Sequence, residues 1–284
     1  MRDSPLDPPG RVVSLCPSIT ETVAALGAWD CLVGRTRFCV HPADRVGSVA
    51  DVGGTKAPKL DKILAIEPDL VLFNEEENRK EDAEALKASG IRVASFFPSD
   101  VPTTAAYIRR LGALLGKPAE GAALAEELLE LRRAIAQELA VESADETRPS
   151  CVYLIWRNPW MAAGSGTFIS SLLEAGGLLN AVDSEEPYPA LSASDIFALD
   201  PSVVLLSSEP FPFAEKHRRE LASATGLPAS RFVLVDGELL SWHGVRTLAG
   251  LRYARSLAQQ LIVGAAGPNP GGAPVSPPGG LNPG

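Results

Sequence analysis

Apolar and polar positions along the chain repeat one phrase in each half. Residues 63–77 read ILAIEPDLVLFNEEE and residues 196–210 read IFALDPSVVLLSSEP, with Ile, Ala, Pro, Val, Leu and Glu at matching offsets. In each copy an apolar helix end is followed by an acid, a proline that cannot continue the helix, an apolar strand and a polar loop. The repeat predicts two lobes of similar build, with chance similarity between two common α/β phrases as the alternative.

Strands and helices alternate around both copies of this phrase. Apolar runs predict strands at 11–15, 32–35, 70–73 and 92–97 in the first half, and at 152–156 and 232–235 beside the repeat in the second. Strands that alternate with helices imply parallel sheets covered on both faces. We therefore expect an α/β fold of two lobes, each with a mainly parallel sheet flanked by helices.

The middle of the chain, between residues 101 and 139, offers no strand. Leu124, Leu128, Leu131 and Ile135 share one face of a long amphipathic helix. We interpret it as a rigid backbone helix that joins the lobes, with an ordinary packed helix as the alternative. The expected organisation is a disordered start at 1–10, an N-terminal α/β lobe at 11–116, the backbone helix and linker at 117–146, a C-terminal α/β lobe at 147–263 and a disordered Pro/Gly tail at 264–284.

Local signals refine three of the helices. Ser18 and Glu21 have the spacing of a capping box at the start of a helix predicted to end near Leu26. His217 lies in the charged stretch EKHRRE, which predicts a solvated helix face. A final helix is expected from Val245 to Ile262.

Composition narrows the possible partners. The 284 residues carry a formal net charge of −9 and no Lys/Arg cluster, which excludes a nucleic-acid partner. No apolar run is long enough to cross a bilayer, and the opening MRDSPLDPPG lacks the features of a secretion signal, so the sequence as written predicts a cytoplasmic location. We expect the protein to be a monomer. Four irregularly spaced cysteines predict buried, reduced thiols, not a zinc site or a disulfide framework.

Aromatic residues concentrate in the loops that follow the predicted strands. Ligands of parallel α/β sheets collect beyond the carboxyl ends of the strands. If the lobes face each other, one cleft would be lined by Phe38, Trp156, Trp160, Tyr188, Phe211 and Trp242. Such a lining suits a large flat ligand better than a small ion, although loop tryptophans also pack simply as supports.

Motifs for catalysis are missing from the sequence. There is no HExxH, no P-loop and no GxGxxG, and the GSG around Ser165 lacks the spacing of a nucleophile elbow. Cys39 and His41 offer two metal ligands where a structural site needs about four, so no metal site is predicted. A histidine that contacts a metal already held in a macrocycle needs only one ligand, and His41 or His243 would suit that role.

With these segments in view, the chain resembles the helical-backbone (class III) periplasmic binding proteins. These are the solute receptors of ABC importers for vitamin B12, ferric siderophores and haem, and the cobalamin-binding branch is the most similar. The resemblance rests on RVVSLCPSITETVAALGAWDCLVGRT, on LDKILAIEPDLVLFNEEENRKED, on the backbone helix and on SWHGVR before the last helix, and it covers about residues 11 to 262.

The resemblance implies two lobes joined by one long helix, with the ligand between them and acids on each lobe that dock onto arginines of a membrane permease. The expected ligand-binding residues are Phe38, Cys39, His41, Thr55, Asn74, Trp156, Tyr188, Glu238, Trp242 and His243. The expected docking acids are Glu76, Glu77, Asp195 and Glu209, which also suit plain solvation or a helix dipole. It further implies an extracytoplasmic location, no enzyme activity, no intrinsic cofactor, and a corrinoid or iron chelate as the transported ligand.

Two other functions stay open at this point. One is a receptor for a ferric siderophore or haem. The other is a cytoplasmic metal-handling protein or enzyme on the same fold, which would use Cys39, His41 and Glu77.

Overall fold

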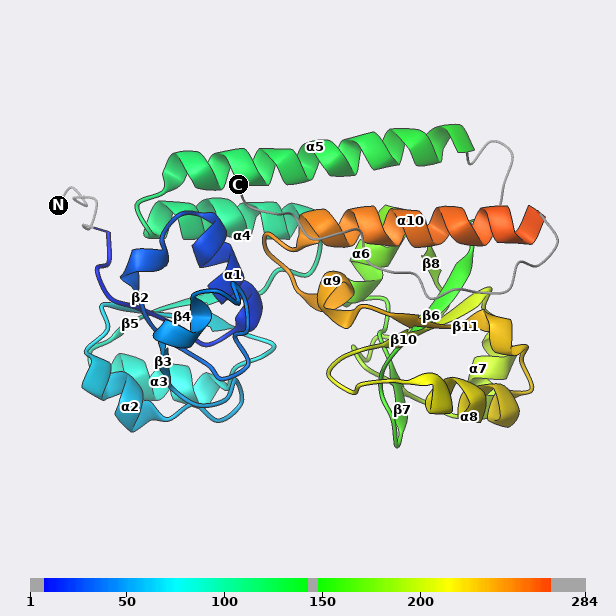
Figure 1. Cartoon of the computed structure of the whole chain (residues 1–284), viewed down its shortest axis with the longest axis horizontal. Helices are drawn as coiled ribbons and strands as arrows, with labels where there is room; N and C mark the ends of the chain where they lie inside the picture. The colour runs from blue at the N-terminus through cyan, green and yellow to red at the C-terminus, as the bar shows by residue number, and fades with distance from the viewer. Residues whose placement is uncertain (1–7, 143–147, 267–284) are drawn as a thin grey trace. The chain divides into compact units, whose positions relative to one another are not determined.

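The computed structural model describes residues 8–142 and 148–266, which form two compact units (Figure 1). Among these residues the first unit holds 8–98, 102–129 and 242–246, and the second holds the rest. Most of the predicted disordered start and tail lie outside the described residues. Gly264 was predicted to open the tail, but it continues the last helix, which ends at Ala266.

The first unit is built on a five-stranded parallel sheet in the order β3-β2-β1-β4-β5. Its strands are β1 (Val12–Ser14), β2 (Leu32–Arg35), β3 (Ala50–Asp51), β4 (Leu70–Asn74) and β5 (Arg92–Phe96). Its helices are α1 (Pro17–Ala25), α2 (Leu60–Ile66), α3 (Lys80–Ala88), most of α4 (Val101–Leu114) and the first half of α5 (Pro118–Glu142), with short 3-10 turns at Trp29–Cys31 and Val46–Ser48.

Strands β1 and β4 form the centre of this sheet because their residues are apolar on both faces. Every residue of β4 is buried, and Val13, Val71 and Ile63 belong to one core cluster. The chain leaves β1 toward β2 on one side and returns to β4 on the other, so the strand order reverses between these two strands. In parallel sheets, this is where the crevice beyond the strand ends can accept a ligand.

The second unit has a mixed sheet in the order β11-β10-β6-β7-β9, with β8 also paired to β6. Its strands are β6 (Ser150–Trp156), β7 (Trp160–Ala162), β8 (Leu179–Asn180), β9 (Ala190–Leu191), β10 (Val203–Ser207) and β11 (Phe232–Val235). Its helices are α6 (Phe168–Gly176), α7 (Ala193–Leu199), α8 (Glu215–Thr225), α9 (Gly237–Ser241) and α10 (Thr247–Ala266), with a 3-10 turn at Ala229–Arg231. Helices α6, α9 and α10 pack together, and α7 packs with α8 (Figure 1). The two sheets confirm the predicted fold class.

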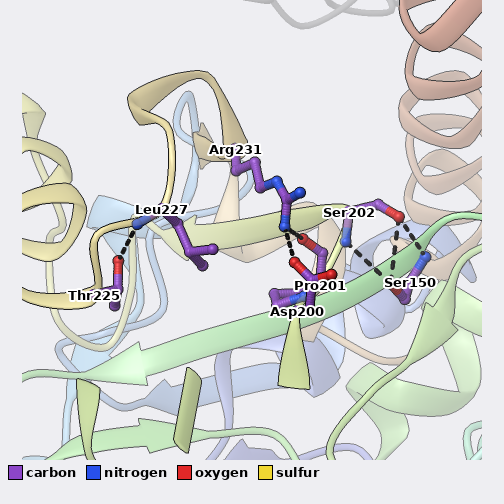
Figure 2. Close-up of polar contacts among 7 residues, drawn as sticks. All are labelled: Ser150, Asp200, Pro201, Ser202, Thr225, Leu227 and Arg231. Carbon is purple, nitrogen blue, oxygen red and sulfur yellow. Dashed lines mark hydrogen bonds and ion pairs between the residues drawn. The ribbon is translucent and has the colours of Figure 1, made fainter. Parts of the chain in front are cut away.

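The repeated phrase forms the same structure in both units. Helices α2 and α7 each end on an acid in the left-handed region, Glu67 (φ 52°) and Asp200 (φ 41°), and the proline that follows leads into β4 or β10. An arginine from a neighbouring strand start holds each junction. Arg11 donates to the carbonyl oxygen of Ile66, and Arg231 pairs with Asp200 and donates to the carbonyl oxygen of Pro201 (Figure 2). The predicted helix, proline and strand are therefore confirmed in both copies.

Replacing Glu67 with glycine is expected to stabilise the first unit by about 1 kcal/mol, because only glycine adopts the left-handed backbone without steric cost. The Glu67 side chain is exposed, so little packing is lost. The free energy of unfolding in urea measures the effect. Glu67→Ala removes the same charge and keeps the strain, so it should leave stability near the parent value; equal effects of the two variants would contradict the backbone explanation.

Two local predictions about helices are wrong. The first residue outside α1 is Cys16, without a side-chain cap, so Ser18 and Glu21 do not form a capping box. His217 is buried, not solvated: its Nδ1 accepts the backbone N–H of Ala214 at 3.0 Å, and its ring packs against Phe211. Burial lowers the pKa of His217 because the charged imidazole loses its hydration.

Candidate functional site

Small polar side chains are buried together near the ends of β1 and β4, where the strand order reverses. Thr20 in α1 is fully buried, and its Oγ1 lies 2.9 Å from Ser14 Oγ and 3.0 Å from Cys39 Sγ. Cys39 Sγ also lies 3.2 Å from Thr36 Oγ1. The tight β1–α1 connection brings these groups under the start of α1, where buried hydroxyls and thiols satisfy one another.

His243 lies next to the start of α1, although it is far from that helix in the sequence. Asn74 Oδ1 accepts the backbone N–H groups of Glu76 and Glu77 at 2.9 and 2.8 Å, which turns its Nδ2 toward His243 Nε2 at 2.8 Å. Because an amide nitrogen only donates, Nε2 is the acceptor and the imidazole is neutral, with its proton on Nδ1. Ser18 Oγ lies 3.2 Å from the same Nε2. Burial lowers the pKa of His243 to about 4.

The residues on either side of His243 are also fixed to the first unit. Arg246 makes a bidentate ion pair with Glu21 in α1, with both nitrogen–oxygen distances at 2.7 Å. Val245 donates its backbone N–H to Thr22 Oγ1 at 3.2 Å. We call residues Trp242–Arg246 the docked segment. Glu21 therefore serves this segment and not the start of its own helix.

Trp242 stands at the start of the docked segment beside two other side chains. The Arg246 guanidinium lies 4.9 Å from the indole centroid, within cation–π range. The ring of His41 meets the indole edge-on, with 5.8 Å between centroids. The structure thus brings together two of the predicted ligand-binding residues, His41 and Trp242, both half-buried.

The other predicted residues of the first unit differ in accessibility. Phe38 is 52% exposed, and Thr55 is half-buried. Cys39, Asn74 and His243 are buried and hydrogen bonded as described, so their side chains are not accessible at the surface of the unit. Their predicted contact with a ligand stays a prediction.

The second unit gathers aromatic residues around the β6–β7 turn. Trp156 is 42% exposed and meets Phe211 edge-on at 5.8 Å. Phe211 contacts Phe213 at 4.9 Å, and Phe213 stacks with Trp160 at 6.1 Å. We call these four residues the aromatic cluster. The antiparallel β6–β7 pairing, which the sequence did not indicate, places Trp156 and Trp160 on the same turn.

An ion pair stiffens the aromatic cluster. Arg157 makes a bidentate pair with Glu220 of α8, at 3.1 and 2.8 Å, and its guanidinium lies 5.7 Å from the Trp160 centroid. Phe213 and the buried His217 are the members of this neighbourhood that sequence reasoning missed. The sequence did contain a signal for Phe213: it alternates with Phe211 around Pro212 in the loop after β10, where a side chain can reach the strand ends.

The remaining predicted residues lie elsewhere on the units. Tyr188 is half-buried in the loop before β9, and Glu238 is half-buried in α9. Glu209 is half-buried and its Oε1 accepts the hydroxyl of Ser241 at 3.0 Å, whereas Glu76 and Glu77 are exposed after β4. Asp195 caps α7, and its hydrogen bonds with Ser192 hold the pKa of that carboxyl below its usual range.

Residues 8–142 and 148–266 contain no group of three or more His, Cys, Asp or Glu side chains placed to hold a metal ion. Cys39 lies between two threonine hydroxyls, and burial raises the pKa of its thiol, which keeps it in the protonated form that binds metals poorly. No helix in the part of the chain that the structure describes has the length and apolarity to span a membrane.

Two units with mainly parallel sheets, a long helix shared by both and aromatic side chains at the strand ends are typical of a solute-binding protein. The chain belongs to the periplasmic binding protein family, whose sequence profile matches residues 12–225. The resemblance noted in the sequence is thereby confirmed at the level of the family.

Similar proteins bind different metal chelates. A cobalamin-binding protein of Halobacterium salinarum is 31% identical over 202 residues, which cover 69% of this chain and 53% of the relative; the chain thus spans about half the length of that protein. A periplasmic haem-binding protein of Pseudomonas aeruginosa has the same fold, with a TM-score of 0.78 and 24% identity over 88% of this chain and 92% of that one. The periplasmic vitamin B12-binding protein BtuF of Vibrio cholerae has a TM-score of 0.75 and 21% identity over 90% and 98% of the two chains.

Proposed function

We propose that this protein is the solute-binding component of an ABC importer and that its cargo is cobalamin or a related corrinoid. The observation that carries the proposal is the aromatic cluster, whose outermost ring, Trp156, is 42% exposed, although tryptophans are highly buried on average. The name of the Halobacterium relative supports the choice of corrinoid.

The chemistry of the aromatic cluster suits a large, weakly charged macrocycle. Flat ligands gain affinity by stacking on indole and phenyl faces, and each aromatic contact contributes roughly 0.5–1.5 kcal/mol beyond its buried area. Trp156 is held by Phe211 and the turn by the Arg157–Glu220 pair, so little rotamer entropy is lost when a ligand arrives. Tyr188, Phe38, His41, Thr55, Glu238 and Trp242 are proposed as further contacts.

Replacing Trp156 with alanine is expected to weaken cyanocobalamin binding about tenfold, because one stacking face of the ligand loses its partner. Equilibrium dialysis measures the dissociation constant without relying on tryptophan emission. Phe197→Ala is the matched control, because Phe197 is another exposed aromatic residue, on α7 and outside the aromatic cluster. Saturable binding that neither substitution changes would contradict the proposed surface, and no binding by the parent protein would overturn the corrinoid cargo.

Haem is the second candidate cargo, and His41 favours it. This imidazole is half-buried next to Trp242, whereas the Nε2 of His243 is engaged with Asn74, so His41 is the better placed of the two to reach an iron atom. Hemin titration followed by absorbance distinguishes the two cargoes: a Soret shift that His41→Ala abolishes would favour haem.

An extracytoplasmic location and a permease partner are part of the proposal. Glu76 and Glu77 on the first unit, and Asp195 and Glu209 on the second, are proposed to pair with basic residues of the permease. Exposed ion pairs contribute mainly to orientation and association rate. Substituting all four with glutamine should leave the dissociation constant for cargo unchanged and reduce uptake by reconstituted permease; unaffected uptake would remove these acids from the interface.

A further inference from the structure

We infer that Ser18, Asn74 and His243 form a lock that holds the docked segment on the first unit and so positions Trp242 as a ligand-binding residue of that unit. His243 is a positioning residue in this scheme and does not touch the ligand. The role of Trp242 rests on the proposed function, whereas the lock itself can be tested without any ligand.

The position of the lock in the sheet is the first reason. Ser18 follows β1 and Asn74 ends β4, so the two residues flank the point where the strand order reverses. Parallel sheets usually bind a ligand beyond this point, and here the chain's own imidazole lies between Ser18 and Asn74 and is only 7% exposed. Asn74 cannot rotate to another partner without losing the backbone N–H groups of Glu76 and Glu77.

The second reason is that the segment is fixed at both ends of a short span. Beyond His243, Gly244 approaches Thr22 so closely that a Cβ atom would lie 2.2 Å from Thr22 Oγ1. Arg246 then reaches Glu21, and the two side chains are only 14% and 22% exposed. A partly buried bidentate pair has one defined geometry. Contacts from His243, Val245 and Arg246 therefore hold the docked segment at three positions.

Trp242 inherits its orientation from these anchors. It precedes His243 directly, and Arg246, fixed by Glu21, lies 4.9 Å from its ring centroid. Asn74 and Ser18 thus fix the position of the backbone next to the indole. Glu21 fixes the Arg246 guanidinium, which in turn packs against the indole ring. An indole held in advance binds a flat ligand with a smaller entropic loss than one that must be ordered on binding.

The direct test uses Trp242 emission in a protein whose Trp29, Trp156 and Trp160 are replaced with phenylalanine. In this background His243→Ala is expected to move the emission maximum to longer wavelength and to raise acrylamide quenching, since the indole loses its fixed setting. His243→Gln should restore the parent spectrum, because its amide oxygen can accept the hydrogen from Asn74 Nδ2. An unchanged spectrum in His243→Ala would overturn the lock.

Ligand binding is then measured with all four tryptophans present. His243→Ala is expected to weaken cyanocobalamin binding about tenfold, and His243→Gln to restore it to within about twofold. If His243→Ala does not fold, Glu21→Gln tests the same positioning from the other end of the segment, with the same shift in emission expected. If the parent protein binds no cyanocobalamin but the variants still change the Trp242 emission, the proposed cargo is wrong and the lock is supported. If the emission changes and the affinity for cyanocobalamin does not, Trp242 is not part of the binding site.

Discussion

Gly244→Ala is expected to destabilise the protein by roughly 3 kcal/mol, the sum of about 1–2 kcal/mol for a left-handed backbone and about 1–3 kcal/mol for overpacking. Gly244 has a φ of +91°, and its added Cβ would lie 2.2 Å from Thr22 Oγ1 and 3.4 Å from the Tyr107 ring. Thr22 cannot withdraw cheaply, because its hydroxyl donates to the Ser18 carbonyl oxygen at 2.7 Å and accepts the backbone N–H of Val245.

Gly27→Ala is the matched control for this effect. Gly27 also has a positive φ, +66°, but nothing lies within 4 Å of a Cβ placed there. It should therefore show only the backbone cost of about 1–2 kcal/mol. Urea unfolding gives both values, and Gly244→Ala combined with Thr22→Ala should recover part of the difference. Equal losses for the two glycines would show that the close approach to Thr22 has no energetic weight.

The local pattern of apolar and polar residues was sufficient to predict the central strands and the mainly parallel sheets of both units. The strands of both repeat copies, β4 and β10, are completely buried apolar runs between a proline and a polar loop, and such runs have few other structures open to them. The alternation of strands and helices then fixed the parallel sheets. The left-handed conformation of Glu67 and Asp200 was not predicted, because a proline favours extended backbone, not a positive φ, in the residue before it.

The candidate site could be predicted only in part, because its main contacts join residues far apart in the sequence. Ser18 and Glu21 had the spacing of a local cap, yet both bind the docked segment more than two hundred positions later. Their separation from His243 and Arg246 is 225 residues in each case, beyond the reach of any periodicity argument. Sequence pattern predicted a ligand-binding role for Trp242 and could not show which unit it belongs to.

His217 shows the same limit in the second unit. The other five residues of EKHRRE are all charged, so the sequence pattern predicts that His217 lies on a solvated helix face. The aromatic rings of Phe211 and Phe213 come from a loop and cover the imidazole from outside the helix. A loop that folds back over a helix leaves no periodic signal in that helix.

Acidification is expected to destabilise the protein through His243 by roughly 3 kcal/mol between about pH 6.5 and pH 4. Burial lowers the pKa of this histidine from 6.5 to about 4. Between these two pH values His243 is therefore protonated in the unfolded chain and neutral in the folded protein. The free energy of unfolding therefore falls as the pH falls through this window, and the His243 contribution stops changing below it. The groups packed against the imidazole include the Tyr107 ring at 5.5 Å, Ser18 and Asn74. None of these three carries a negative charge that could stabilise a protonated His243.

The difference between the parent and His243→Gln isolates this contribution. His217 and several carboxylates also bind protons unequally in the two states, and the pKa of His217 is lowered by burial in the same sense. Those terms are common to both proteins and cancel. Urea unfolding at about pH 7 and about pH 4.5 should show a steeper loss for the parent than for the variant. Equal losses of unfolding free energy in the two proteins would mean that His243 becomes protonated in the folded state. A charged imidazole between Asn74 and Ser18 would need water next to it, so the site would have to be open to solvent. A site open to solvent around His243 could not hold Trp242 in one orientation, so the pH profile tests the positioning of the indole independently of any ligand.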